Sequence, residues 1–357
     1  MSLTELGFTA SFADAFALHE SRGLLPARVA RMDKGLYHVL IAPDAEPLRA
    51  ESSGRLRHEA REPADFPAVG DWVAIAPPEG GTTLIHAVLP RATAFTRTAP
   101  GRETIEQVVA ANVDVAFLVA GLDNDFNLRR LERYLVAARE SGARPVIVLN
   151  KADMLAPSLF AVRLAETEDI AGDTPVHALS AARGDGLEAL APYLLPGATI
   201  ALLGMSGVGK STLVNALLGC EKMATGAVRE GDQRGRHTTT HRELVRLKSG
   251  AWLLDTPGMR VLALWGGEEG VSAAFDDVAA IAARCRFGDC AHQGEPGCAV
   301  AAALQSGELP EERYASWRKL QREAHAFAAR HDKRLAAKEK ARWKAITKSV
   351  RDRPTKR

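Results

Sequence analysis

A glycine-rich phosphate loop is the feature that most restricts how this chain can fold. Residues 204–211 read GMSGVGKS, and they stand between an apolar segment at 199–203 and a helix-forming segment at 211–219. A loop of the form G-x-x-x-x-G-K-S follows a buried strand and opens a helix, whose first N–H groups converge on phosphate oxygens. The pattern therefore predicts an α/β domain that binds a nucleotide. The predicted phosphate-binding residues are Gly204, Met205, Ser206, Gly207, Val208, Gly209, Lys210, Ser211 and Thr212.

Two side chains of this loop have predicted roles beyond binding. Lys210 is expected to bridge the β- and γ-phosphates, and the Ser211 hydroxyl to ligate Mg²⁺. The loop never touches the base, so it does not by itself distinguish ATP from GTP.

The choice of base depends on NKAD at 150–153, which follows an apolar run at 145–150. A carboxylate at Asp153 can accept hydrogen bonds from guanine N1–H and the exocyclic amine, a pattern that adenine does not offer. The stem of Lys151 would pack over the base, and a backbone N–H near Ser180 would meet the guanine carbonyl. These elements favour GTP over ATP. The predicted guanine-site residues are Asn150, Lys151, Ala152, Asp153, Ser180 and Ala181.

Two further segments are predicted to sense the γ-phosphate. DTPG at 255–258 has the form D-x-x-G, in which Asp255 reaches Mg²⁺ through water and the Gly258 N–H meets the γ-phosphate. A threonine of GRHTTTH, at 235–241, can ligate Mg²⁺ only while that phosphate is present, which would make a switch. Thr239 is the predicted ligand, with Thr238 and Thr240 as alternatives.

The residue after D-x-x-G bears on hydrolysis. Ras-like enzymes place a water-orienting glutamine there, whereas this chain has Met259. Intrinsic hydrolysis is therefore expected to be slow. His237 is the nearest titratable candidate for positioning the water, and the alternative is that it only packs or contacts RNA. The predicted catalytic residues are His237, Thr239 and Lys210.

The order of these motifs is unusual. Ordinary small GTPases run from the phosphate loop through the switch threonine and D-x-x-G to N-K-x-D, whereas here N-K-A-D precedes the phosphate loop. This order indicates a circular permutation, which the site can survive because the termini of a domain often lie close together.

The segments around this domain show other patterns. Residues 1–23 have roughly helical spacing, and between 25 and 90 five short runs alternate with Gly, Pro and Asp, which predicts a small β-barrel of OB-like or SH3-like type. A charged connection at 55–67 is either a functional loop or a solvated one. Residues 95–103 are interpreted as a linker.

Three cysteines and a histidine cluster within 14 residues, at Cys285, Cys290, His292 and Cys298. Three thiolates and one imidazole suit a closed, structural Zn²⁺ site, and the alternative is a group of free thiols. The charges are also unevenly placed: residues 313–357 hold 16 of the 46 lysines and arginines but 4 of the 44 acidic residues. A basic tail of this kind suggests a polyanionic partner, or else a solvated helix.

Taken together, these motifs resemble the family of small-ribosomal-subunit-biogenesis GTPases called RsgA, over nearly the whole chain. The resemblance implies a multidomain α/β protein with an N-terminal five-stranded OB-like β-barrel, a circularly permuted P-loop GTPase domain and a C-terminal helical zinc-binding domain. We expect these domains at 1–97, 98–268 and 269–357. The resemblance further implies binding of GTP and GDP, of the 30S subunit and its 16S rRNA, and hydrolysis stimulated by the subunit during its late maturation.

No run approaches the ~20 apolar residues of a membrane-spanning helix, and the start of the chain lacks the features of an export signal. We therefore expect a cytoplasmic protein that does not enter a membrane, and a monomer. One alternative function is a GTP-dependent RNA-binding module that acts on another structured RNA with incidental hydrolysis. An ATPase or small-substrate kinase is disfavoured by NKAD.

Overall fold

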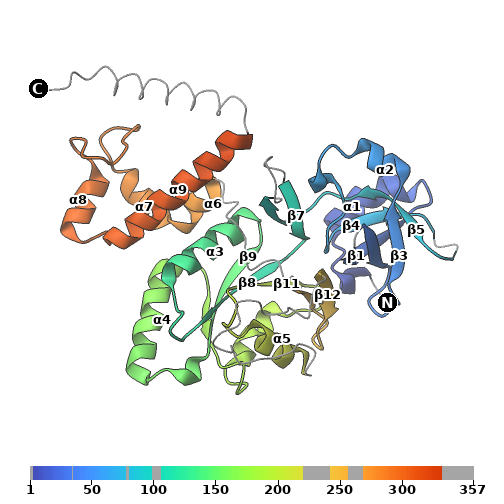
Figure 1. Ribbon diagram of the computed structural model, residues 1–357, viewed down its shortest axis with the longest axis horizontal. Coiled ribbons are helices and arrows are strands. Elements are labelled where there is room, and N and C mark those ends of the chain that lie inside the picture. The colour runs from blue at the N-terminus through green and yellow to red at the C-terminus, as the bar shows by residue number, and fades with distance from the viewer. Residues whose placement is uncertain are drawn as a thin grey trace, which may run out of the picture. The chain divides into compact units, whose positions relative to one another are not determined.

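The computed structural model describes residues 3–33, 35–77, 80–98, 106–219, 242–255 and 268–331 (Figure 1). These residues form two compact units. The first comprises the described residues up to 255, and the second comprises residues 268–331. Among the described helices, none has the length and apolar character needed to cross a membrane.

The first unit begins with a closed β-barrel. β1 pairs antiparallel with β2 and β2 with β3, β3 pairs parallel with β5, and β4 joins β5 back to β1. This closed five-stranded arrangement confirms the OB-like barrel of the two barrel types considered. Its interior is apolar, with Val29, Val39 and Ile85 inaccessible to solvent. The strands are β1 (Leu25–Asp33), β2 (Leu36–Leu40), β3 (Leu48–Ser52), β4 (Trp72–Ile75) and β5 (Thr83–Val88).

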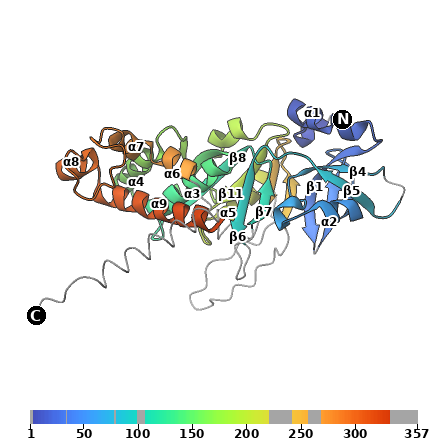
Figure 2. The ribbon, with the colours of Figure 1, turned by 90° about the horizontal axis from the view of Figure 1, so that it is seen from above.

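Short helices flank the barrel strands (Figure 2). The N-terminal segment forms η1 (Leu3–Leu6) and α1 (Ala10–Glu20), as its spacing predicts. The charged connection is not a plain loop, because it contains α2 (Gly54–Glu59) and η2 (Pro63–Asp65). Ser53 begins α2 by accepting a 3.2 Å hydrogen bond from the Leu56 N–H, which compensates for the shortness of the helix.

The interpretation of residues 95–103 as a linker is wrong for its first part. β6 (Ala94–Thr98) pairs antiparallel with β7 (Glu106–Ala111). Val108 and Ala111 pack against Ala68, which lies between η2 and β4, so the two strands have their own small apolar cluster. Threonine and phenylalanine in β6 favour a strand. The Pro and Gly that follow are typical of a loop, and they led to the interpretation of the whole segment as a linker.

The rest of the first unit is the doubly wound domain that the motifs predict. Strands β10, β9, β8, β11 and β13 run parallel in that order, and β12 is antiparallel to β13. The chain order reverses between β8 and β11, which is where α/β sheets bind ligands at the carboxyl ends of their strands. The strands are β8 (Val115–Gly121), β9 (Arg144–Asn150), β10 (Val176–Ala178), β11 (Thr199–Leu203), β12 (Arg242–Arg246) and β13 (Trp252–Asp255).

Helices connect these strands. Asn127 begins the first of them by accepting a 3.1 Å hydrogen bond from the Arg130 N–H, and apolar residues such as Phe117 and Leu213 fill the core against the sheet. The helices are α3 (Leu128–Glu140), η3 (Ala152–Met154), α4 (Pro157–Ala171), η4 (Leu187–Tyr193) and α5 (Lys210–Leu218).

The barrel and the doubly wound sheet are continuous. β1 pairs with β12 at Arg31↔Glu243 and Met32↔Arg242, which makes one eleven-stranded sheet. Arg28 of β1 is 1% exposed and donates to the carbonyls of Leu6, Gly70 and Asn112 and to the Thr199 hydroxyl. One buried guanidinium thus joins the N-terminal segment, the barrel and the strand that leads into the phosphate loop. Burial lowers its pKa to about 10, so it stays charged at neutral pH.

The second unit is helical in its described part. Arg313 is 6% exposed, donates to the Asp277 carboxylate at 2.7 Å and lies over the Phe275 ring at 4.1 Å. It therefore fastens the last helix to the two before the cysteine segment. The helices are α6 (Glu268–Ala274), α7 (Asp276–Ala282), α8 (Ala299–Ser306) and α9 (Glu311–His331).

Candidate nucleotide site and metal centre

Three loops meet at the carboxyl edge of the parallel strands. The phosphate loop follows β11, NKAD begins at the last residue of β9, and Asp123 lies just beyond the end of β8. Because parallel strands end at the same edge of a sheet, the segments that the sequence marks as a nucleotide site are adjacent in space.

Glycines allow the phosphate loop to approach its neighbours. A Cβ on Gly204 would stand 2.5 Å from the Val119 carbonyl oxygen, and one on Gly209, where φ is +90°, would stand 2.2 Å from Asn150 Nδ2. Lys210 Nζ donates to the carbonyls of Gly204, at 2.7 Å, and Met205. The ammonium group therefore lies over the loop, where phosphate oxygens would be held.

Asn150 connects the phosphate loop to the loop after β10. Its side chain is 2% exposed. Nδ2 donates to the Val208 carbonyl at 2.9 Å, while Oδ1 accepts from the Ala181 N–H at 3.0 Å. The first residue of NKAD is thus a buried brace between two loops rather than a group exposed to a ligand.

Asp153 faces the serine and the arginine of the segment SAAR at 180–183. The Arg183 guanidinium lies 3.4 Å from its carboxylate. The hydrogen bond from the Ser180 hydroxyl, above all, holds the pKa of Asp153 below its usual value, against the opposing effect of burial. The carboxylate is therefore ionised at neutral pH and can act as a hydrogen-bond acceptor.

Lys151 is held by Asp123, which belongs to none of the sequence motifs. Its Nζ donates to Asp123 Oδ2 at 2.5 Å and to the Gly207 carbonyl at 2.6 Å. Burial tends to raise the pKa of Asp123, but the hydrogen bonds from Lys151 and the Asp125 N–H outweigh it and lower that pKa. Neither Asp123 nor Arg183 is among the site residues predicted from the sequence. The position of Asp123 directly after a buried strand could have indicated that it lies at the ligand-binding edge of the sheet.

The remaining candidates divide into two groups. Ser206, Gly207 and Val208 form the body of the phosphate loop, Ser211 and Thr212 occupy the first turn of α5, and Ala152 begins η3. His237, Thr239 and Gly258 lie outside the described residues, as does the side chain of Asp255, whose backbone ends β13.

The four candidate metal ligands of the second unit come together. The ligand atoms of Cys285, Cys290, His292 and Cys298 all lie within 4.8 Å of one another. His292 Nδ1 is 3.6 Å from Sγ of both Cys285 and Cys298. Zn–S bonds of ~2.3 Å and Zn–N bonds of ~2.0–2.1 Å at tetrahedral angles require about this separation. The cluster therefore has the dimensions and donor set of a structural metal site.

Backbone groups shape this cluster. The Ala301 N–H donates to Cys298 Sγ at 3.4 Å, at the start of α8. Glu295 accepts from the N–H groups of Ala291 at 3.0 Å and Gln293 at 2.6 Å, which closes the loop that carries His292. His292 itself has a φ of +57°, in the left-handed region. The backbone of this turn is therefore in a conformation that residues other than glycine rarely adopt.

Comparison with known proteins agrees with this geometry. The chain is 53% identical to the small ribosomal subunit biogenesis GTPase RsgA of Opitutus terrae, over 99% of this chain and 98% of that protein. The chain belongs to the RsgA family. It is also 46% identical to the RsgA protein of Syntrophotalea carbinolica, over 94% of this chain and 93% of that one. The sequence model of the RsgA GTPase matches residues 88–265.

Solved structures show the same fold. YjeQ from Thermotoga maritima has a TM-score of 0.63 at 27% identity, over 84% of this chain and 98% of that one. YloQ, described as a circularly permuted GTPase, has a TM-score of 0.61 at 23% identity, over 84% of this chain and 95% of that one. As an RsgA family member the chain is a circularly permuted GTPase, and the family assignment made from its motifs is confirmed.

Proposed function

We propose that this GTPase binds the 30S ribosomal subunit through its 16S rRNA, assists late maturation of the subunit in the cytoplasm, and hydrolyses GTP faster when bound there. The relatives are named for biogenesis of the small ribosomal subunit. The observation that carries the proposal to this chain is its 53% identity to one such relative over 99% of its length, and the Asn150 brace between the phosphate loop and the loop after β10 supports its nucleotide-binding part. The OB-like barrel supplies the kind of surface that commonly binds nucleic acid.

Within the nucleotide site we assign roles by position. Lys210 would exchange the carbonyls of Gly204 and Met205 for β- and γ-phosphate oxygens. Asp153, already ionised, would read guanine. Ser211 and Thr239 would hold Mg²⁺, which supplies positive charge against the phosphates when it is bound. His237 would position the water, and a partner that orders its segment would accelerate hydrolysis.

We further propose that the Cys285, Cys290, His292 and Cys298 cluster holds one Zn²⁺ in a structural role. The donor set fits zinc, and four protein ligands leave no open position for catalysis. The basic tail would add phosphate contacts to RNA. Removing it from about residue 330 should then flatten the dependence of RNA affinity on salt.

The deciding experiment is GTP turnover with and without purified 30S subunits. We expect the subunit to stimulate turnover. His237→Ala should remove most of this stimulation without changing GDP affinity, whereas Met259→Ala should leave the stimulation in place. Equal turnover with and without subunits would refute the proposed coupling and favour a GTP-dependent module that acts on another RNA. Full stimulation of His237→Ala would remove His237 from the mechanism.

A further inference from the structure

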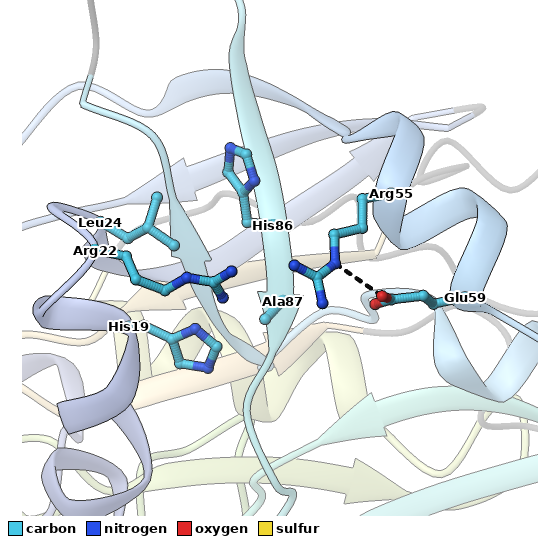
Figure 3. Close-up of a pocket in the computed structure, with 7 residues that line it drawn as sticks. All are labelled: His19, Arg22, Leu24, Arg55, Glu59, His86 and Ala87. Carbon is cyan, nitrogen blue, oxygen red and sulfur yellow. Dashed lines mark hydrogen bonds and ion pairs between the residues drawn. The ribbon is translucent and has the colours of Figure 1, made fainter.

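The N-terminal helix α1 has no part in the chemistry proposed above, yet its end closes one side of a cavity on the barrel (Figure 3). The cavity holds about 320 Å³, which is at the lower end of the ~300–1,000 Å³ typical of small-ligand sites. Residues from α1, from the turn between α1 and β1, from α2 and from β5 meet there. The lining residues are His19, Arg22, Leu24, Arg55, Glu59, His86 and Ala87.

Aromatic packing fixes the α1 side of this cavity. The rings of Phe8 and Phe12 lie 4.6 and 6.1 Å from the ring of Trp72 on β4, and Phe16 is buried beside them. The Arg22 N–H then donates to the His19 carbonyl at 3.1 Å as the helix ends. The fold therefore holds α1 against the barrel, and His19 and Arg22 with it.

The opposite side of the cavity belongs to α2. Arg55 and Glu59 lie one helical turn apart, and Arg55 Nε donates to the Glu59 carboxylate at 2.7 Å. Figure 3 shows Arg22 and Arg55 extending toward each other from the two sides of β5, at the level of Ala87. Two guanidinium groups that approach one another repel unless an anion lies between them.

The lining is short of negative charge. Two arginines and two histidines face a single carboxylate, and that carboxylate is already paired with Arg55. Within the described part of the chain, the Arg22 side chain makes no hydrogen bond or ion pair, and the buried Nδ1 atom of His19 has no hydrogen-bond partner. Burial and the charge of Arg22 also lower the pKa of His19, as expected where the local potential is positive.

We propose that this cavity binds one phosphate group, anchored by Arg22 and Arg55, with His19 as a third contact. Guanidinium groups present paired N–H donors that match phosphate oxygens. The phosphate belongs either to an RNA backbone or to a free anion such as inorganic phosphate. An RNA phosphate here would deepen the proposed function by giving the N-terminal helix a part in subunit binding, whereas a free anion would not depend on that function.

The test uses the full-length protein saturated with GDP, so that the phosphate loop is filled. Inorganic phosphate and a short single-stranded RNA without terminal phosphates are each titrated while the histidine ring signals are followed by NMR. We expect the His19 signals to move and the pKa of His19 to rise with the bound anion. A response to inorganic phosphate identifies a free-anion site, and a response to RNA alone identifies a backbone site. No response to either overturns the proposal.

Variants sharpen the result. Arg22→Ala and Arg55→Ala should each weaken binding by ~10-fold, whereas Glu59→Gln should strengthen it because it removes the one negative charge. Arg57→Ala is the matched control, since Arg57 lies on the same helix but pairs with Glu51 and is not part of the lining. Equal losses from Arg22→Ala and Arg57→Ala, or weaker binding by Glu59→Gln, would contradict the site. Subunit-stimulated GTP turnover, measured separately on wild type, tests the proposed function independently.

Discussion

The nucleotide site of the first unit and the cysteine cluster of the second both gather polar groups from separate segments, but different forces hold them. Asn150 is 2% exposed and bridges two loops by hydrogen bonds of 2.9 and 3.0 Å. It lies at the end of a strand within an eleven-stranded sheet. The ligand-bearing segment, residues 285–298, contains no helix or strand, and Cys298 is the one buried ligand of the four.

This difference shows which site depends on its ligand for its shape. The phosphate loop and the NKAD segment are held by the sheet beneath them and by buried polar contacts, so we expect their geometry to be in place before GTP binds. Three of the four candidate metal ligands, which lie within 4.8 Å of one another, are only partly buried, so burial holds them less firmly than it holds Asn150. If the cluster holds zinc, as we propose, metal binding would contribute folding free energy, which is about 10–16 kcal/mol in zinc-finger peptides. Each prediction below tests one side of this contrast, beginning with the largest effect.

Removing a metal ligand should unfold the cluster and leave the nucleotide site intact. We expect His292→Ala to lose zinc, measured by metal analysis, and to make residues 285–298 sensitive to protease, while GDP affinity stays within about 2-fold of wild type. The lost stabilisation is a large part of the metal's ~10–16 kcal/mol. His325→Ala, which removes a histidine of α9 outside the cluster, is the control and should retain zinc. Retention of zinc by His292→Ala would contradict the assignment.

Removing the Asn150 brace should lower the free energy of unfolding by less than the loss of a metal ligand does. It should affect both of the loops that Asn150 joins. Asn150→Ala leaves the Ala181 N–H and the Val208 carbonyl without their partners, at ~1–3 kcal/mol each if both stay buried. We expect a lower free energy of unfolding in denaturant and GDP affinity reduced by ~10–100-fold. Ser141→Ala changes another buried polar residue, the C-cap of α3, and should reduce stability without altering GDP affinity. Equal GDP affinity in Asn150→Ala and wild type would show that the brace is not needed.

The parts of this molecule that could be predicted from sequence are those with fixed local spacing. The phosphate loop, its strand and its helix are contiguous, so the pattern alone placed them, and the motif order predicted the permutation. The five barrel strands were predicted because turn residues separate them. The sequence pattern could not choose between barrel types, because that choice depends on the parallel pairing of β3 with β5.

Long-range contacts were beyond prediction. Arg28 reads as an ordinary charged residue in a strand, but it is buried and joins segments as distant as Leu6 and Thr199. The pairing of Asp123 with Lys151 likewise depends on β8 and β9 being neighbours. Two short helices in the charged connection were missed because a helix of six residues, such as α2, depends on its cap more than on periodicity. The roles assigned to His237 and Thr239 stay predictions.

Changing the Asp153 carboxylate, to which we assign the reading of guanine, should alter specificity more than stability. Asp153→Asn replaces an acceptor with an amide, so preference should move from GTP toward xanthosine triphosphate, whose C2 carries a carbonyl. The loss of hydrogen bonds to a charged group, ~1.5–3 kcal/mol, corresponds to about 10–100-fold in GTP affinity. Competition binding with both nucleotides measures the change. Arg183→Ala, which removes the partner of Asp153 but not the carboxylate, should keep the preference for GTP. An unchanged preference in Asp153→Asn would show that another group reads the base.

The smallest expected effect concerns pH and the Ser180 hydroxyl. Its hydrogen bond is the main reason that the pKa of Asp153 lies below the usual 3.8. Because this pKa is depressed, the ionised Asp153 carboxylate contributes fully to GDP affinity above its usual titration range. The contribution is lost as pH falls through the depressed value. Ser180→Ala should raise that pKa, so GDP affinity should begin to fall at a higher pH than in wild type. Near pH 7 the two proteins should differ by less than about 3-fold, because Asp153 is ionised in both.

Asp153→Asn has no carboxylate to titrate there and should lose this part of the pH dependence. Parallel pH profiles for Ser180→Ala and wild type would show that the hydroxyl does not set the charge of Asp153, and the nucleotide site would then be less fully prepared by the fold than its buried brace implies.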